Sequence, residues 1–363
     1  MQVKIFDLEF CLIENLENLK IKNLETTALI LSSGGKERGY VQLLSDLFEI
    51  SFKDELLFFV DNYPSLEDIE NLYGELSNRK INSIFAIGGG SVIDSAKSIS
   101  LLLSLEIVDD VLQIINFPEN LLFKNNQKIQ LIAFPTTAGT GSEATQFATI
   151  WDKKKNKKYS LDHQSLLPDY VYFLPQLLHT PEFDTQLFPA LDCFSHSLES
   201  IWNKNRTKKS INYSKLSLEN SFLGDLETFH NFKDNINYSL QLNKSSYYAG
   251  KAINSTRTSI AHAISYPLTL NYNVPHGLAC SFTLSAIYQL VESELLIDLE
   301  LHNLIKKHID RLENLNLKER INNFLDLDSA LNLLDEMKTK NRTENFMKDL
   351  NKEDYIEILS KSF

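Results

Sequence analysis

The first half of the chain alternates short apolar runs with segments of helical periodicity. Apolar runs that end in glycine, proline or a polar turn are typical of buried parallel strands. Ser65, followed three residues later by Asp68, is typical of a helix start. Strands are expected over 27–35, 56–60, 82–87, 129–134 and 167–173, with helices over 39–47, 65–76 and from the glycines at 88–90 to about 103. This alternation predicts a parallel α/β sheet.

The pattern changes near Pro181, after which helical periodicity dominates. Helices are expected over 191–201, 247–264 and 278–291, and amphipathic leucine-rich segments continue to Phe363. A chain of 363 residues is long enough for two domains with cores of their own. We therefore predict a Rossmann-like α/β domain over 1–178 and an all-α domain over 179–363.

Composition narrows the classes of partner. The chain has 36 Lys and Arg against 48 Asp and Glu, a net charge of −12, which argues against nucleic-acid and anionic-membrane partners. We expect no membrane span, because no apolar run reaches about 18 residues, and no signal segment, because the first residues lack an apolar stretch. Three widely spaced cysteines do not form a disulfide framework. We expect a cytoplasmic protein.

Two glycine-rich loops follow predicted strands. Gly88-Gly89-Gly90-Ser91 leads from a strand into a helix, where free backbone N–H groups and the helix dipole favour a pyrophosphate. A tight strand-to-helix turn is the alternative interpretation of these glycines. The loop at 136–142 adds hydroxyls and further amides. Ligands of open α/β sheets bind beyond the carboxyl ends of the strands, where both loops are expected.

Two histidine motifs in the second half suggest a metal site. Asp192 and His196 are four residues apart, so a helix places them on one face. His262 lies in an apolar helical pattern, and His276 follows Pro275 and starts a new element. One Asp and three His suit Fe(II) or Zn(II). Taken singly, the same residues are also typical of a surface pair and of hydrogen-bonded core histidines.

Four motifs, taken in order, resemble those of the iron-containing (group III) alcohol dehydrogenases. The resemblance spans roughly residues 28 to 282. It implies a dinucleotide-binding α/β domain and a helical domain on either side of a cleft that holds the active site, a fold shared with dehydroquinate synthase. The motifs are Gly-Gly-Gly-Ser-x-x-Asp-x-Ala-Lys at 88–97, Pro-Thr-Thr-Ala-Gly-Thr-Gly-Ser-Glu at 135–143, Asp-x-x-x-His at 192–196, and His262 with Pro-His-Gly at 275–277.

Motif positions carry the family's functional residues onto this chain. The resemblance implies four metal ligands, which are Asp192, His196, His262 and His276. The expected nicotinamide-cofactor site is lined by Gly34 after the first strand and by Gly89, Gly90, Ser91, Asp94, Thr136, Thr137, Thr140 and Lys158.

Two departures from the family pattern bear on chemistry. Many members have a further histidine four residues after the third ligand, where this chain has Tyr266. A phenol, a water or another route must then complete proton transfer, unless Tyr266 is only a packed side chain. The second departure is at 32–36, which lacks the acidic residue that NAD-preferring members place after the first strand and contains Lys36. NADPH is therefore favoured, with NADH the alternative.

A narrower resemblance concerns the substrate. Residues 257–269 and 157–161 look like the subgroup that reduces phosphonoacetaldehyde to 2-hydroxyethylphosphonate. Arg257 is five residues before His262 on what is expected to be the same helical segment, and its guanidinium would bind a phosphonate in bidentate fashion, with Thr258 beside it. The alternative is an arginine that pairs with a carboxylate at the cleft rim.

The resemblance implies a metal-dependent oxidoreductase that reduces a small, anionic aldehyde to a primary alcohol. It also implies a homodimer. Three alternatives stay open at this point: a general aliphatic alcohol dehydrogenase of the same family, a lyase like dehydroquinate synthase, and a non-catalytic nucleotide-binding metalloprotein.

Overall fold

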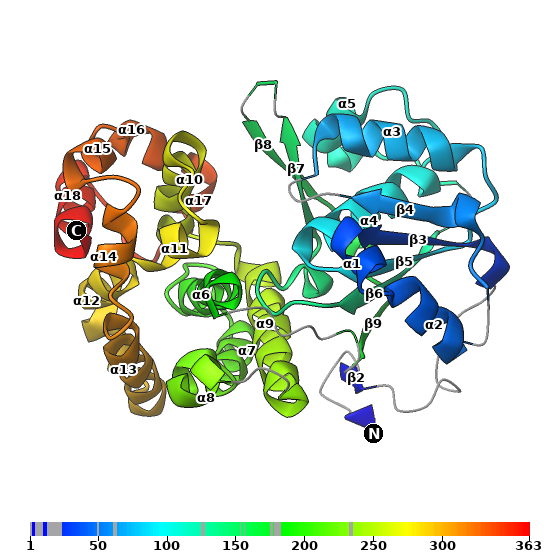
Figure 1. The fold of residues 1–363 in the computed structure, drawn as a ribbon. Coiled ribbons are helices and arrows are strands. Elements are labelled where there is room, and N and C mark those ends of the chain that lie inside the picture. Colours follow the sequence, from blue (N-terminus) through cyan, green and yellow to red (C-terminus); the bar gives the residue numbers. More distant parts are fainter. Residues whose placement is uncertain are drawn as a thin grey trace. The chain divides into compact units, whose positions relative to one another are not determined.

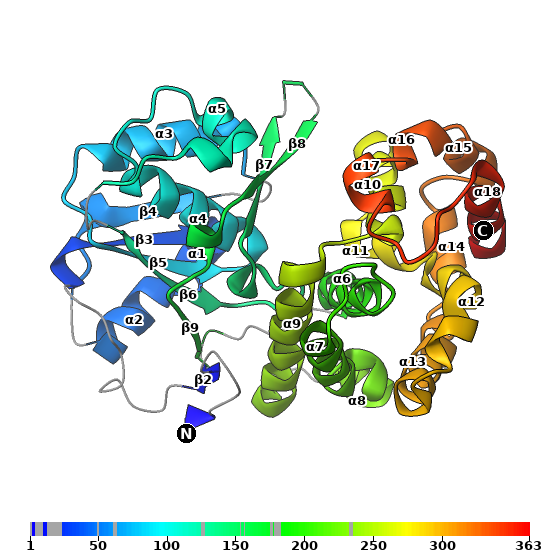
Figure 2. The same ribbon diagram turned by 180° about the vertical axis from the view of Figure 1, so that it is seen from behind.

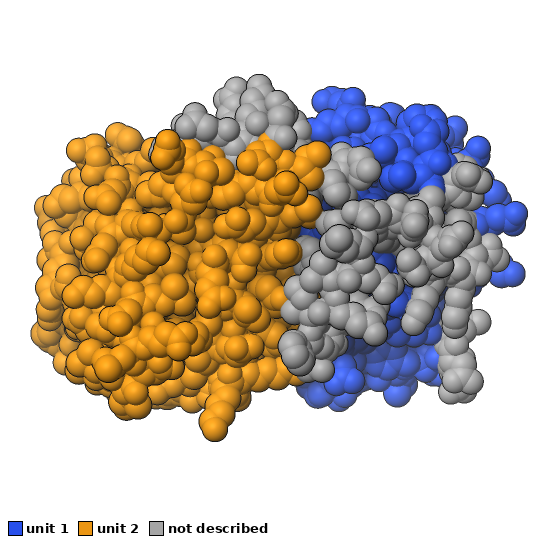
Figure 3. Space-filling model, turned by 90° about the horizontal axis from the view of Figure 1, so that it is seen from below, with its two compact units in different colours: residues 1–137, 142–179 blue, residues 138–141, 180–363 orange. Residues whose placement is uncertain are grey.

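A computed structural model describes residues 2–3, 10–12, 24–48, 51–60, 64–124, 128–152, 154–155, 157–174, 177, 183–231 and 235–363. The chain forms two compact units, one of residues 1–137 with 142–179 and one of residues 138–141 with 180–363 (Figure 3). The domain boundary expected at 178/179 falls on residues outside the described ones and stays a prediction, as does the cleft.

The first unit is built on a seven-stranded sheet with the order β1-β2-β9-β6-β5-β3-β4 (Figure 1). All neighbouring strands run parallel except β1, which is antiparallel to β2. The predicted parallel sheet is confirmed. Its strands are β1 (Gln2–Val3), β2 (Phe10–Leu12), β3 (Thr27–Ser32), β4 (Leu57–Val60), β5 (Ser83–Gly88), β6 (Gln130–Pro135) and β9 (Tyr170–Phe173).

Both faces of this sheet are buried, as its continuous apolar runs require. In β3, Ala28 and Ile30 belong to one core with helices α3 and α4, while Leu29 and Leu31 belong to a second core with α2. The capping box predicted at Ser65 and Asp68 is present at the start of α3. The helices of this unit are α1 (Ser33–Glu37), α2 (Tyr40–Phe48), α3 (Leu66–Ser77), α4 (Gly90–Ser104) and α5 (Val111–Asn116).

A hairpin of β7 (Phe147–Asp152) and β8 (Lys157–Asp162) completes the first unit. Lys154 and Lys155 are exposed between the two strands, and Lys157 and Lys158 lie in β8.

The second unit is helical over its described residues, as predicted. Helices α6, α7 and α9 pack together and lie side by side in both ribbon views (Figures 1 and 2). The helices are α6 (Phe183–Ile201), α7 (Lys208–Glu219), α8 (Leu226–Asn231), α9 (Ile236–Thr256), α10 (Ile260–Tyr272), α11 (His276–Ser281), α12 (Leu284–Leu295), α13 (Leu299–Glu313), α14 (Leu317–Asn322), α15 (Leu327–Leu331), α16 (Leu334–Met337), α17 (Lys340–Thr343) and α18 (Lys352–Ser362). No helix among the described residues is long and apolar enough to cross a membrane.

Helix α11 lies against the backbone of α6. A Cβ at Gly277 would be 1.8 Å from the carbonyl oxygen of Phe188, so only glycine allows this approach. The Ser281 hydroxyl donates to the Leu191 carbonyl oxygen over 2.9 Å and ties the two helices together. The close approach brings the start of α11 beside the middle of α6.

Two expectations about the helices are wrong. The helix expected over 278–291 is divided, because α11 ends at Ser281 and α12 begins at Leu284. The single helix expected over 247–264 is two helices, because α9 ends at Thr256 and α10 begins at Ile260. Arg257 stands in the break with φ 68° and ψ 170°. Essentially only glycine adopts this backbone conformation readily, and no pattern in the local sequence predicts it.

Candidate functional site

Three helices of the second unit bring the four predicted metal ligands together. Helix α6 carries Asp192 and His196 one turn apart, α10 carries His262, and α11 begins with His276. Oδ1 of Asp192 lies 3.6 Å from Nε2 of His196, 3.4 Å from Nε2 of His262 and 3.8 Å from Nε2 of His276. One carboxylate oxygen thus faces three imidazole nitrogens.

These separations fit a shared cation better than direct hydrogen bonds. Charge-assisted N–H···O bonds are about 2.7–2.9 Å long, whereas two donors at about 2.1 Å from one tetrahedral ion are about 3.4 Å apart. Oδ1 of Asp192 and Nε2 of His262 are buried, and neither has a hydrogen-bond partner among the described residues. A cation bound by these two atoms would satisfy both of them.

The electrostatics of the site favour a charged carboxylate. Burial by itself would raise the pKa of Asp192, but His196, His262 and His276 together hold that pKa far below its usual value. The carboxylate is therefore ionised at neutral pH, as a metal ligand must be.

Glu199 contacts His262 on the Nδ1 side of its ring. The sequence analysis missed this residue. Its carboxylate is fully buried and accepts a hydrogen bond from Nδ1 of His262 over 2.7 Å. It also accepts from the backbone N–H groups of Ser259, Ala261 and His262 over 3.0, 2.7 and 3.3 Å, at the start of α10. A carboxylate on Nδ1 fixes the tautomer that leaves Nε2 available to a metal.

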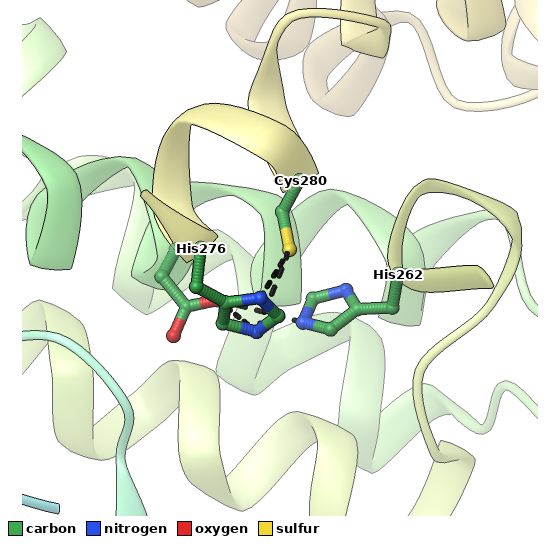
Figure 4. A group of neighbouring side chains, drawn as sticks. His262, His276 and Cys280 are labelled. Atoms are coloured by element: carbon green, nitrogen blue, oxygen red, sulfur yellow. Dashed lines mark hydrogen bonds and ion pairs between the residues drawn. The ribbon is translucent and has the colours of Figure 1, made fainter. Parts of the chain in front are cut away.

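Cys280 is the second residue that the sequence analysis missed. It lies on α11 one turn after His276, and its Sγ is 3.6 Å from Nε2 and 3.7 Å from Nδ1 of that histidine (Figure 4). Among the described residues, donor atoms of Asp192, His262, His276 and Cys280 lie within 4.8 Å of one another. Burial raises the pKa of the Cys280 thiol, so the sulfur keeps its proton at neutral pH unless a cation displaces it.

Tyr266 lies next to the metal ligands and is paired with an arginine. Its ring stacks on that of His276, with centroids 5.8 Å apart and an interplanar angle of 13°. Arg342, on α17, donates from Nη2 to the Tyr266 hydroxyl over 2.8 Å, and its Cζ lies 4.2 Å from the Tyr266 ring centroid. Nε of Arg342 is buried without a hydrogen-bond partner among the described residues. Arg342 is the third residue that sequence reasoning missed.

The structure corrects the placement of Arg257. It was expected on the helical segment of His262, but it is exposed in the break before α10. Asn203 and Asn345 hold this break by donating from Nδ2 to the carbonyl oxygens of Arg257 and Thr258 over 3.1 and 2.9 Å. The proposed roles of Arg257 and Thr258 in binding substrate stay predictions.

In the first unit, the glycine loop leads into α4 as expected. Gly89 is the N-cap of α4, and no side chain caps this helix. A Cβ at Gly89 would be 2.8 Å from Oγ1 of Thr137, so the two loops meet closely there. Gly90 and Ser91 form the first turn of α4, where backbone N–H groups are suited to a phosphate.

Asp94 is a buried residue that contacts other residues of the first unit. It is 8% exposed, and its Oδ2 accepts from the N–H of Thr149 over 2.9 Å. Its Oδ1 lies 3.7 Å from Nζ of the buried Lys97, which also donates to Oγ1 of Thr145 over 3.0 Å. Burial raises the pKa of Asp94 and lowers that of Lys97 to about 8. Asp94 joins α4 to the hairpin, and its contact with cofactor stays a prediction.

The remaining predicted cofactor residues lie on several elements. Thr136 is buried and Thr137 exposed in the first unit, while Thr140 is exposed in the second. Lys158 lies on β8, with Nζ 5.5 Å from the ring centroid of Trp151. Gly34 is in α1 rather than in the expected strand, which ends at Ser32.

Comparisons with known proteins identify the family and the fold of the chain. Residues 12–175 match the family described as iron-containing alcohol dehydrogenase, and residues 188–362 match the C-terminal domain of the Fe-containing alcohol dehydrogenase family. The chain is similar to an iron-containing alcohol dehydrogenase of Thermotoga maritima of known structure, with a TM-score of 0.76 and 21% identity over 93% of this chain and 92% of that one. The predicted two-domain fold is thus confirmed.

Two curated relatives are similar over part of their length. A 4-hydroxybutyrate dehydrogenase of Clostridium kluyveri is 31% identical over 60% of this chain and 56% of its own. A phosphonoacetaldehyde reductase of Streptomyces viridochromogenes is 33% identical over 62% of this chain and 58% of its own. The matches therefore span somewhat more than half of each relative.

Proposed function

Because the chain belongs to the family of iron-containing alcohol dehydrogenases, we propose that it is a metal-dependent, NAD(P)H-dependent reductase of a small aldehyde. One observation carries this proposal: a single buried carboxylate oxygen faces three imidazole nitrogens at 3.4–3.8 Å. In the proposed site, Asp192, His196, His262 and His276 hold Fe(II) or Zn(II). The cofactor phosphates lie on the N–H groups at Gly89, Gly90 and Ser91.

The bound metal polarises the aldehyde carbonyl and the nicotinamide supplies the hydride. The side chains of the protein position the reacting groups and supply charge. Glu199 holds His262 in one tautomer through Nδ1. The Tyr266 hydroxyl, which accepts a hydrogen bond from Arg342, donates the proton that the product alkoxide requires.

We further propose that the substrate carries an anionic group, with phosphonoacetaldehyde the preferred candidate. The names of the two curated relatives refer to substrates with a carboxylate and a phosphonate. Two arginines are suited to such a group. Arg342 donates to the Tyr266 hydroxyl, and its Nε is buried without a hydrogen-bond partner among the described residues. Arg257 is held in a conformation that costs about 1–3 kcal/mol, and such strain clusters at ligand-binding positions.

NADPH is the proposed cofactor, with NADH as the alternative. Residues 33–36, directly after β3, contain Lys36 and no acidic residue. Glu37 and Arg38 follow. Nη1 of Arg38 is 3.1 Å from the position of a Cβ at Gly34, so a guanidinium lies over this turn. A cation here complements a 2′-phosphate. We also propose a homodimer and a cytoplasmic location on the family resemblance.

The test compares an anionic aldehyde with a neutral one. Protein loaded with Fe(II) or Zn(II) is given NADPH with phosphonoacetaldehyde or with propionaldehyde. We expect a kcat/KM at least tenfold higher for phosphonoacetaldehyde and a loss of that preference in Arg342→Ala or Arg257→Ala. Arg79→Ala, an exposed arginine of the first unit, is the matched control. Equal use of propionaldehyde would indicate a general alcohol dehydrogenase, and turnover without net NADPH oxidation would indicate a lyase.

Arg257→Gly separates the two explanations of the strained residue. Glycine relieves the left-handed φ, so this variant should be at least as stable as the wild type. If Arg257 binds the substrate, kcat/KM for phosphonoacetaldehyde should still fall while that for propionaldehyde is unchanged. An Arg257→Gly variant with unaltered preference would leave Arg342 as the anion-binding arginine.

A further inference from the structure

Cys280 lies among the proposed metal ligands and has no role in the chemistry described above. Its side chain is fully buried on α11, one turn after His276. Figure 4 shows its sulfur directed toward the rings of His276 and His262 rather than away from them. The unpartnered buried atoms Oδ1 of Asp192 and Nε2 of His262 face the same space.

The distances around this sulfur match those between two ligands of one ion. A thiolate at about 2.3 Å and an imidazole nitrogen at about 2.1 Å from one five-coordinate ion are about 3.1–3.8 Å apart for angles of about 90–120° at the ion. Sγ of Cys280 lies 3.6 Å from Nε2 of His276. Among the described residues, one group has donor atoms that all lie within 4.8 Å of one another. Its members are Asp192, His262, His276 and Cys280.

We propose that the Cys280 thiolate is a further ligand of the metal, in addition to Asp192 and the histidines. The proposal rests on the metal centre of the proposed function and goes beyond it, because it adds a soft donor to a set of nitrogen and oxygen atoms. On metal binding, the thiol proton is released to solvent and a metal–sulfur bond forms. A soft thiolate favours Zn(II) over Fe(II). The centre of this chain is therefore biased toward zinc.

Cys193 provides a matched control on the neighbouring helix. It is also a buried cysteine that forms no disulfide, and it directly follows the ligand Asp192 in sequence. Its Sγ, however, lies 3.3 Å from the Ser245 hydroxyl and 3.9 Å from the Ser217 hydroxyl. Successive positions of a helix point in different directions, so Cys193 does not belong to the metal site. A Cys193→Ser change tests the effect of losing a buried sulfur alone.

The experiment uses cobalt as a spectroscopic probe. The full-length protein is stripped with a chelator and titrated with Co(II), while bound cobalt is counted by elemental analysis. We expect a sulfur-to-cobalt charge-transfer band in the near ultraviolet for the wild type and for Cys193→Ser. The band should be lost in Cys280→Ser, which keeps the size of the side chain and replaces the soft donor. In competition titrations, Cys280→Ser should lower the affinity for Zn(II) about 10–100-fold and that for Fe(II) by less.

The outcomes distinguish this proposal from the proposed function. One equivalent of cobalt bound without a charge-transfer band would overturn the role of Cys280 and leave the metal centre of Asp192 and the histidines in place. A band that persists in Cys280→Ser would overturn it as well. Failure of the wild type to bind cobalt at all would contradict the metal centre, and the cysteine ligand with it. Far-ultraviolet circular dichroism of each apo-protein establishes that the variants are folded.

Discussion

Glu199→Gln is the change that most sharply tests how α6 organises the metal centre. Glu199 is fully buried and accepts four hydrogen bonds of 2.7–3.3 Å, three from backbone N–H groups at the start of α10 and one from Nδ1 of His262. Although burial would raise its pKa, His262 and these N–H groups lower that pKa. The site is thus built for a carboxylate.

Glutamine has nearly the same shape but only one accepting oxygen. Its NH₂ group must face one or two of the donors at the start of α10 or Nδ1 of His262, and each unsatisfied buried donor costs about 1–3 kcal/mol. We expect the apo-protein to lose about 2–4 kcal/mol of unfolding free energy. If the amide faces Nδ1, the ring loses the partner that fixes its tautomer, and metal affinity falls about 10–100-fold.

Two measurements check these magnitudes. Urea unfolding of apo-protein gives the loss of stability, and competition with a chelator gives the dissociation constant for Zn(II). The matched control is Glu292→Gln, which alters a carboxylate that also contacts a histidine, with Oε1 3.2 Å from Nε2 of His302, but which lies on α12 and is partly exposed. This control should leave metal affinity unchanged within about twofold.

A Glu199→Gln variant that binds Zn(II) as tightly as the wild type would refute the reasoning. It would mean that His262 is oriented by its own helix alone. Loss of metal affinity in Glu292→Gln to the same extent would be equally damaging, because the effect would then reflect net charge and not the contact with Nδ1.

Three further predictions follow from other contacts. Gly277→Ala places a Cβ against the carbonyl oxygen of Phe188, so it should lower unfolding free energy by about 1–3 kcal/mol and weaken Zn(II) binding by moving His276; Gly224→Ala, with open space around its Cβ, should do neither. Burial raises the pKa of Glu143 to about 7, so its contribution to stability is complete below about pH 4.5 and is lost as the pH rises through about 7. Urea unfolding at pH 5 and pH 8 should show a loss of up to about 3 kcal/mol in the wild type that is absent in Glu143→Gln, and equal losses in both would contradict the assignment. Arg38→Ala should raise the KM for NADPH about tenfold with that for NADH unchanged, and a parallel rise in both would argue against a 2′-phosphate contact.

Local patterns in the sequence were sufficient for most of the fold. The strands end at glycine, proline or polar turns, and the capping box at Ser65 fixes the start of α3. Pro275 and the glycine after His276 mark the start of α11. The boundary between α9 and α10 was missed because Arg257 adopts a conformation typical of glycine, which no residue near it in sequence indicates.

The candidate site shows where sequence reasoning ends. Asp192 and His196 were found because their spacing places them on one helical face. Glu199 lies three residues after His196 on the same helix. Its role, however, depends on the start of α10, some 60 residues later along the chain, because it accepts a hydrogen bond from the N–H of Ser259. The pairing of Arg342 with Tyr266 spans 76 residues. Contacts of this kind arise from tertiary packing, and a single sequence does not encode them in any local pattern.

The most direct test of the metal-dependent reductase is a titration of activity against bound metal. Chelator-treated protein is reconstituted stepwise with Zn(II) or Fe(II), and NADPH oxidation with phosphonoacetaldehyde is followed at each step. The account predicts no turnover in the apo-protein, a rate that rises in proportion to bound metal up to one equivalent per chain, and neither retained metal nor turnover in His262→Ala. Full activity of metal-free protein, or a fully active and metal-loaded His262→Ala variant, would contradict it.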